Sequence, residues 1–189
     1  MQRFTTWAGE QREDRLSVLF TPWGEGLTRS WYRDAIVRLS HLPHVARVAI
    51  QTNLAARTGW LAGANPRAAA LWATYHPGQV NREAFLGRCR ELDDLAIRYS
   101  VGVVGLPEHY AEAVALRAAL PPTVYLWVNA AEGHVYTGEE ERRWTALDLN
   151  PTHDVGGKHG GDDVSGMSGN LCLGHRRARP KCCDLDWPA

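Results

Sequence analysis

The feature that most constrains this chain of 189 residues is an alternation of short apolar stretches with longer amphipathic segments. Five stretches are almost continuously apolar and rich in β-branched or aromatic residues: Leu16–Phe20, Arg47–Gln51, Leu71–Tyr75, Tyr99–Val104 and Thr123–Val128. Such strands are typical of a parallel sheet that is covered on both faces. The helix-like segments before, between and after them are Phe4–Glu13, Thr28–His41, Asn81–Ile97, Glu108–Leu120 and Thr137–Leu147. The alternation predicts βα units joined by right-handed crossovers.

The predicted fold class is therefore α/β, in the form of a partial (β/α) barrel of about five βα units. A closed barrel of the TIM type needs eight strands and typically about 250 residues, more than this chain offers. The segment Phe4–Glu13 precedes the first strand and resembles the second half of a βα unit whose strand is missing. Thr28 or Ser30 is expected to cap the next helix, and Thr137 with Glu140 fits a capping box.

Composition changes near residue 150, which divides the chain into a domain over residues 1–149 and a tail over residues 150–189. The tail holds 7 of the 18 glycines and few large aliphatic residues. A segment of this kind buries little apolar surface, so we expect it to be disordered. Its Cys172, His175, Cys182 and Cys183 are a weak candidate zinc set, because adjacent cysteines seldom both reach one ion.

Charge and hydropathy exclude several classes of partner. Lys plus Arg and Asp plus Glu both number 21, so the formal net charge is zero, and neither nucleic acid nor an anionic membrane is an expected partner. No run approaches the roughly 18 apolar residues of a membrane span, and the first residues contain no apolar signal-peptide core. The predicted location is cytoplasmic. The cysteine at position 89 lies among apolar residues of a predicted helix and is interpreted as buried packing.

Polar residues follow each predicted strand, where ligands bind in parallel α/β folds. The first stretch, LSVLF, leads into Thr-Pro-Trp-Gly24-Glu25, and the later strands lead to Asn53, His76, Gly105 with Glu108, and Asn129. A glycine lets a ligand approach the backbone, and the carboxylate of Glu25 is placed to accept hydrogen bonds from a ligand ammonium group. The alternative is that Glu25 is an acidic residue that favours a helix N-terminus.

Together these segments resemble the radical S-adenosylmethionine (SAM) superfamily. PWGEGL occupies the place of that family's Gly-Gly-Glu-Pro-like motif, VAIQTNL is similar to its third strand, VGVVGLPEH to its Gly-x-Ile-x-Gly-x-x-Glu motif, and YLWVNA to its sixth strand. The segments LFTPWGE, TNL, TYHPGQV and YSVGVVG are similar in sequence to those of one uncharacterised bacterial subfamily. The resemblance covers about residues 4–148.

The resemblance implies SAM and a [4Fe–4S] cluster as cofactors, an unidentified substrate, and reductive cleavage of SAM to a 5′-deoxyadenosyl radical. It implies that Gly24 and Glu25 hold the methionine amino group, and that Asn53, His76, Gly105 and Asn129 line the rest of the cofactor site. The family's three cluster cysteines, spaced C-x₃-C-x₂-C, do not occur in this sequence. We therefore expect a radical SAM-type domain that is truncated at its N-terminus and is inactive alone.

Two other hypotheses stay open. One is a degenerate barrel that binds a small molecule without redox chemistry, and the other is a different α/β-barrel enzyme that uses Glu25, His76 and Glu108 as acids and bases. His76 is about as well explained by a structural role. Among the tryptophans, the predicted packing residues are Trp31, Trp60 and Trp144, whereas Trp23 and Trp127 line a pocket or pack in the core.

Overall fold

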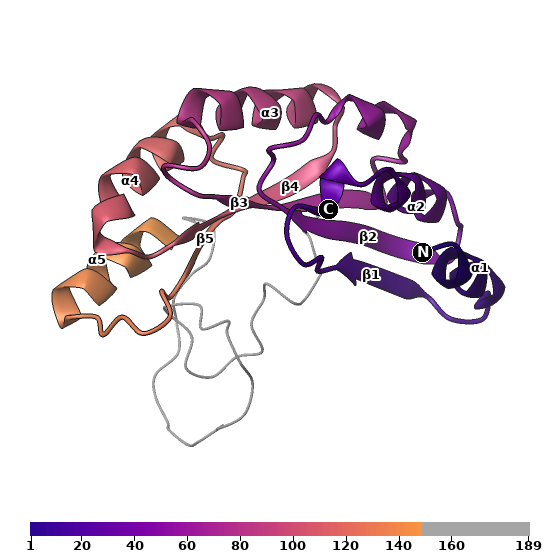
Figure 1. The fold of residues 1–189 in the computed structure, drawn as a ribbon, viewed down its shortest axis with the longest axis horizontal. Helices are drawn as coiled ribbons and strands as arrows, with labels where there is room; N and C mark the ends of the chain where they lie inside the picture. Colours follow the sequence, from indigo (N-terminus) through magenta and orange to yellow (C-terminus); the bar gives the residue numbers. More distant parts are fainter. Residues whose placement is uncertain (149–189) are drawn as a thin grey trace, which may run out of the picture. The chain divides into compact units, whose positions relative to one another are not determined.

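The computed structural model describes residues 1–148 (Figure 1). Its helices and strands follow the predicted alternation: α1 Gln2–Glu10, β1 Leu16–Phe20, η1 Gly26–Thr28, α2 Ser30–Ser40, β2 Val45–Thr52, η2 Gly59–Gly63, β3 Ala69–Tyr75, α3 Arg82–Asp94, β4 Arg98–Val104, η3 Pro107–His109, α4 Tyr110–Ala119, β5 Leu126–Asn129 and α5 Gly138–Asp148. The disorder and the zinc set predicted for residues 150–189 lie outside the described residues.

The five strands form one sheet in the order β1-β2-β3-β4-β5, and β2 pairs in parallel with both β1 and β3. This confirms the α/β class and the parallel sheet, whereas the barrel form stays a prediction. The chain divides into two compact units, and the division falls within β4 between Val101 and Gly102. The single domain predicted over residues 1–149 also stays a prediction.

In the first unit, helices α2 and α3 supply the apolar residues that cover the sheet. Ile36 and Leu39 of α2 are fully buried, and this helix packs against β2. Phe85 of α3 packs against Tyr75 of β3, with ring centroids 5.1 Å apart. Helix α3 begins where the Asn81 side chain accepts hydrogen bonds from the Glu83 and Ala84 N–H groups, which would otherwise lack intrahelical partners.

The second unit has its core between β4, β5 and α5. Trp127 of β5 is 2% exposed, and a Cβ at Gly102 of β4 would collide with its indole ring. Glycine is therefore required at this position of an otherwise apolar strand. Trp144 of α5 is also buried and meets the Tyr110 ring edge-on at 5.0 Å. The burial of Trp144 confirms its predicted packing role, and the burial of Trp127 favours core packing, one of the two roles predicted for it.

Three sequence expectations about β1 and α2 are wrong. Neither Thr28 nor Ser30 caps α2, whose N-cap is Arg29 without a side-chain hydrogen bond; the Thr28 hydroxyl donates to the Glu25 carbonyl instead. Trp31 is 40% exposed, and its ring lies against Tyr32 and under the Arg29 guanidinium. No residue of β1 is buried, since β1 is an edge strand of the sheet, so it is not covered on both faces as its apolar sequence predicts.

Within residues 1–148, no helix is both long enough and apolar enough to cross a membrane.

Candidate functional site

Two glycines shape the loop that follows β1. Gly24 has a φ of +76°, a backbone conformation that L side chains rarely adopt. Gly26 is buried, and a Cβ there would lie 2.7 Å from Pro22 Cγ and 2.9 Å from Ile50 Cδ1. The turn at Gly24 and the close packing at Gly26 together hold Glu25 between them at the carboxyl end of β1.

The carboxylate of Glu25 joins the end of β1 to the end of β2. Its Oε1 accepts a hydrogen bond from the Leu27 N–H at 2.7 Å, and its Oε2 accepts one from the Asn53 N–H at 2.7 Å. The Thr52 hydroxyl lies 3.0 Å and 2.9 Å from the two carboxylate oxygens. We call this set of Glu25, Leu27, Thr52 and Asn53 the Glu25 bracket.

The Glu25 bracket orients the carboxylate but leaves part of the carboxylate's capacity to accept hydrogen bonds unused. An ionised carboxylate offers about four lone-pair sites, whereas the bracket supplies two N–H groups and one hydroxyl with a single proton. Glu25 is half-buried, so solvent reaches part of this residue. The group can therefore accept one further charge-assisted hydrogen bond from a cationic donor.

The loop that follows β2 is held in place by its own polar groups and by α3. The Asn53 side chain accepts from the Ala55 N–H at 2.9 Å, and Thr52 Oγ1 accepts from the Leu54 N–H at 3.0 Å. Arg88 of α3 donates to the Ala56 carbonyl. These contacts fix a loop in which Leu54 has a φ of +55°, so the donors that Thr52 and Asn53 offer to Glu25 are positioned in advance of any ligand.

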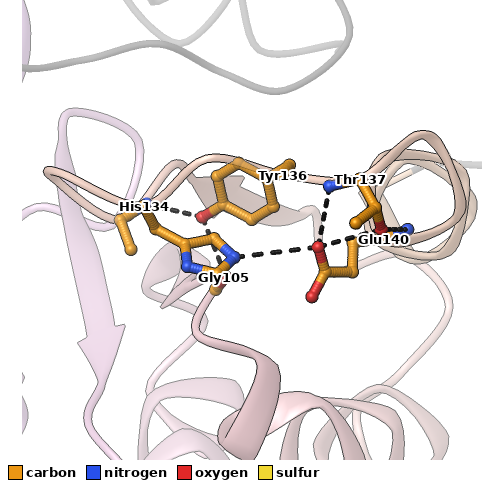
Figure 2. Close-up of polar contacts among 6 residues, drawn as sticks. Gly105, His134, Tyr136, Thr137 and Glu140 are labelled. Carbon is orange, nitrogen blue, oxygen red and sulfur yellow. Dashed lines mark hydrogen bonds and ion pairs between the residues drawn. The ribbon is translucent and has the colours of Figure 1, made fainter.

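A second polar cluster lies at the ends of β4 and β5, within the second unit (Figure 2). The Gly105 N–H donates to the Asn129 carbonyl at 2.8 Å. The Tyr136 hydroxyl donates to the Gly105 carbonyl at 2.8 Å and accepts from the Ala131 N–H at 2.7 Å. A Cβ at Gly105 would lie 3.1 Å from the Tyr136 hydroxyl oxygen, so glycine allows this close approach. The cluster supplies hydrogen bonds to backbone N–H and carbonyl groups, so we interpret it as structural.

Glu140 and His134 lie beside that cluster. Glu140 accepts from the Thr137 N–H at 2.8 Å, and the Thr137 hydroxyl oxygen accepts from the Glu140 N–H at 3.2 Å, which confirms the predicted capping box. Hydrogen bonds from the Thr137 backbone and side chain lower the pKa of Glu140. The His134 Nε2 atom lies 3.8 Å from Glu140 Oε2, and its ring meets Tyr136 edge-on (Figure 2).

The predicted site residues therefore fall into separate groups. Glu25 and Asn53 meet in the Glu25 bracket with Gly24 beside them, and Gly105 meets Asn129 in the second unit. His76 is half-buried at the end of β3, where its carbonyl accepts from the Gln79 N–H at 3.1 Å, and Glu108 is exposed on η3. Trp23 is 99% exposed, so neither the packing nor the pocket predicted for it is correct.

The described residues do not fit an iron–sulfur cluster. Such clusters need thiolate ligands, and the cysteine that residues 1–148 contain, Cys89, is 2% exposed. Burial, followed by the nearby Asp93 carboxylate, raises the pKa of this thiol to about 12, so it is protonated at neutral pH. Its burial confirms the predicted packing role. Over the same residues, no group of three or more His, Cys, Asp or Glu side chains is arranged to hold a metal ion.

Sequence reasoning missed two residues that organise these clusters. Thr52 bonds both oxygens of Glu25, and its position at a predicted strand end, directly before Asn53, was the available signal. Tyr136 bridges the ends of β4 and β5 through its hydroxyl group, and only its position before the capping box marked it. Both roles depend on contacts between segments that are distant in the sequence.

A scan against protein-family models and a search of curated proteins found no match to this chain.

Proposed function

We propose that this chain is a radical SAM-type domain that binds a small molecule bearing an ammonium group, with SAM as the leading candidate, at the Glu25 bracket. The observation that carries the proposal is the state of the Glu25 carboxylate. It is held by the Leu27 and Asn53 N–H groups at 2.7 Å each, is half-buried, and keeps an acceptor site for a further donor.

Ligand recognition follows from this geometry. An ammonium group offers three N–H donors and a full positive charge, which complements an acceptor-only carboxylate. Because the two backbone N–H groups hold the carboxylate in one orientation, little conformational entropy is lost when the ligand binds. A charge-assisted hydrogen bond of this kind contributes about 1.5–3 kcal/mol.

The proposal is limited to binding, because the described residues do not supply the three thiolates that a [4Fe–4S] cluster requires. When bound, SAM supplies an adenosyl group and a sulfonium. This chain's own residues orient the ligand: Glu25 holds its ammonium group, and the turn at Gly24 leaves space in which a Cβ would meet no atom within 4 Å. The acid–base alternative has weaker support, since both Glu25 oxygens already accept hydrogen bonds and Glu108 is exposed.

Isothermal titration calorimetry with three ligands tests the proposal. SAM and S-adenosylhomocysteine both carry the ammonium group, whereas adenosine does not. We expect Glu25→Gln to weaken binding of the first two ligands about tenfold to a hundredfold and to leave adenosine binding unchanged.

Two control variants separate ligand recognition from stability. Thr52→Val removes one donor of the Glu25 bracket and keeps the carboxylate, so it should lower the melting temperature while retaining most of the affinity. Glu108→Gln changes an exposed carboxylate at another strand end and should alter neither quantity. Equal SAM affinity in wild type and Glu25→Gln, or no binding by a folded wild-type chain at millimolar SAM, would contradict the proposal.

A further inference from the structure

Two arginine side chains meet at the amino-terminal end of the sheet in the first unit. Arg47 comes from β2, and Arg98 is the first residue of β4. Arg47 Nη1 donates to the carbonyl oxygen of Arg67 at 3.1 Å, and Arg98 Nη2 donates to the same oxygen. One neutral carbonyl therefore brings together two full positive charges, which we call the arginine pair.

The arginine pair lacks a compensating carboxylate. No ion pair formed within residues 1–148 includes either guanidinium group. The Nε atoms of both arginines are buried and have no hydrogen-bond partner among residues 1–148. Burial, followed by the positive charge of Arg47, lowers the pKa of Arg98. Two like charges held together without an anion are electrostatically unfavourable, and an anion bound between them would relieve the repulsion.

The backbone around the arginine pair is rigid. The Ser40 hydroxyl oxygen accepts from the Asn65 N–H at 2.9 Å, and the Asn65 side chain accepts from the Arg67 N–H at 3.1 Å. These bonds fix the turn that carries the Arg67 carbonyl. The pairing of β1 with β2 also shifts by one residue at Ala46, directly before Arg47. Irregularities of this kind redirect neighbouring side chains and occur often beside functional sites.

Both guanidinium groups keep donors for a ligand. A guanidinium carries five N–H donors. Arg47 uses those of Nη1 on the Ala46 and Arg67 carbonyls, and Arg98 uses one of Nη2 on Arg67, so Arg47 Nη2 and Arg98 Nη1 make no hydrogen bond within the described part of the chain. Both side chains are only half-buried. Solvent therefore reaches the arginine pair.

We propose that Arg47 and Arg98 form a binding site for a phosphate group. Planar guanidinium forks match the oxygen geometry of phosphate, and two of them can contact different oxygens of one group. The site does not reflect a generally basic surface, because the formal net charge of the chain is zero. It lies near the opposite end of β2 from Thr52 of the Glu25 bracket, about 17 Å away along the strand. It is therefore distinct from the proposed ammonium site.

Calorimetric titration at constant ionic strength tests the phosphate site, with inorganic phosphate and adenosine monophosphate as probes. Binding of inorganic phosphate supports a site for the free ion, and binding of the nucleotide alone supports a site for a phosphomonoester. In both cases we expect Arg47→Gln and Arg98→Gln to weaken binding at least about tenfold, since each removes charge-assisted hydrogen bonds. Arg98→Lys keeps the charge and should lose less affinity.

The matched control is Arg38→Gln, which removes an exposed arginine from α2 and should leave phosphate binding unchanged. Circular dichroism verifies that each variant folds, and if Arg98→Gln does not, Arg47→Gln and Arg98→Lys provide the same comparison. The proposal is overturned if wild type binds neither probe at millimolar concentration, or if Arg38→Gln weakens binding as much as Arg47→Gln does.

Discussion

The two ends of β2 carry charge in opposite ways. At its carboxyl end, one carboxylate is surrounded by donors: Glu25 accepts from Leu27, Thr52 and Asn53. At its amino end, two cations share one carbonyl, that of Arg67, without a carboxylate partner among the described residues. We expect the first arrangement to stabilise the fold and to keep a limited capacity for a ligand. We expect the second to contribute little to the stability of the fold and to gain more from a bound ligand.

Removal of the Glu25 side chain should have the largest effect on stability. Glu25→Ala leaves the Leu27 and Asn53 N–H groups and the Thr52 hydroxyl without their charged acceptor, and we expect the free energy of unfolding to fall by about 3 kcal/mol. Urea unfolding measures the change. The control Glu108→Ala, at an exposed position, should stay within about 0.5 kcal/mol of wild type. Equal effects of the two substitutions would mean that the hydrogen bonds of the Glu25 bracket do not contribute measurably to the free energy of unfolding.

Asp148 is a carboxylate that, compared with Glu25, accepts fewer hydrogen bonds, and its burial affects stability through its pKa. Burial raises its pKa to about 6, and hydrogen bonds from Tyr125 and the Val128 backbone act in the opposite direction. Because the folded state binds the proton more tightly than the unfolded state does, the stabilisation is complete below pH 4 or so and is lost as pH rises through about 6. We expect this group to lower the free energy of unfolding by on the order of 2 kcal/mol over that window.

Asp148→Asn should remove this pH dependence, because an amide does not titrate. Urea unfolding of wild type and variant at a series of pH values between about 4 and 7 checks the result. A wild-type slope that persists in Asp148→Asn would assign the dependence to another group.

The Thr52 hydroxyl should contribute less than the Glu25 carboxylate does. Thr52→Val keeps the shape of the side chain and removes a hydroxyl that donates to Glu25 and accepts from the Leu54 N–H. The expected loss in the free energy of unfolding is about 1 kcal/mol. A loss as large as that of Glu25→Ala would contradict this ranking, since the Thr52 hydroxyl would then contribute as much to stability as the carboxylate does.

The arginine pair should give the smallest effect. Arg47→Gln in phosphate-free buffer removes one hydrogen bond to the Arg67 carbonyl but also removes a repulsion with Arg98. The two terms oppose each other, so the free energy of unfolding should change by less than about 1 kcal/mol. Thermal unfolding with and without phosphate measures this change. A loss above about 2 kcal/mol in phosphate-free buffer would indicate that Arg47 is mainly a structural residue.

Local sequence patterns predicted much of the secondary structure. The apolar run Leu16–Phe20 coincides with β1, and Thr137 with Glu140 forms the capping box expected from their spacing. Both features depend on residues that are neighbours in the chain. The caps proposed at Thr28 and Ser30 failed because Arg29 occupies the N-cap position, with Thr28 still in η1 and Ser30 already the first residue of α2.

For the candidate site, the sequence by itself determined which residues are present at the strand ends: Gly24 and Glu25 after β1, and Asn53 after β2. Only the tertiary structure decided what they do. Glu25 and Thr52 are 27 residues apart, and Arg67 and Arg98 are 31 apart, so neither contact leaves a periodic signal. Parallel pairing places β2 beside β1 and thereby brings the Thr52 hydroxyl and Asn53 N–H to the carboxylate. A hydrogen bond depends on distances of about 3 Å, which the packing of the sheet sets and residue identity does not.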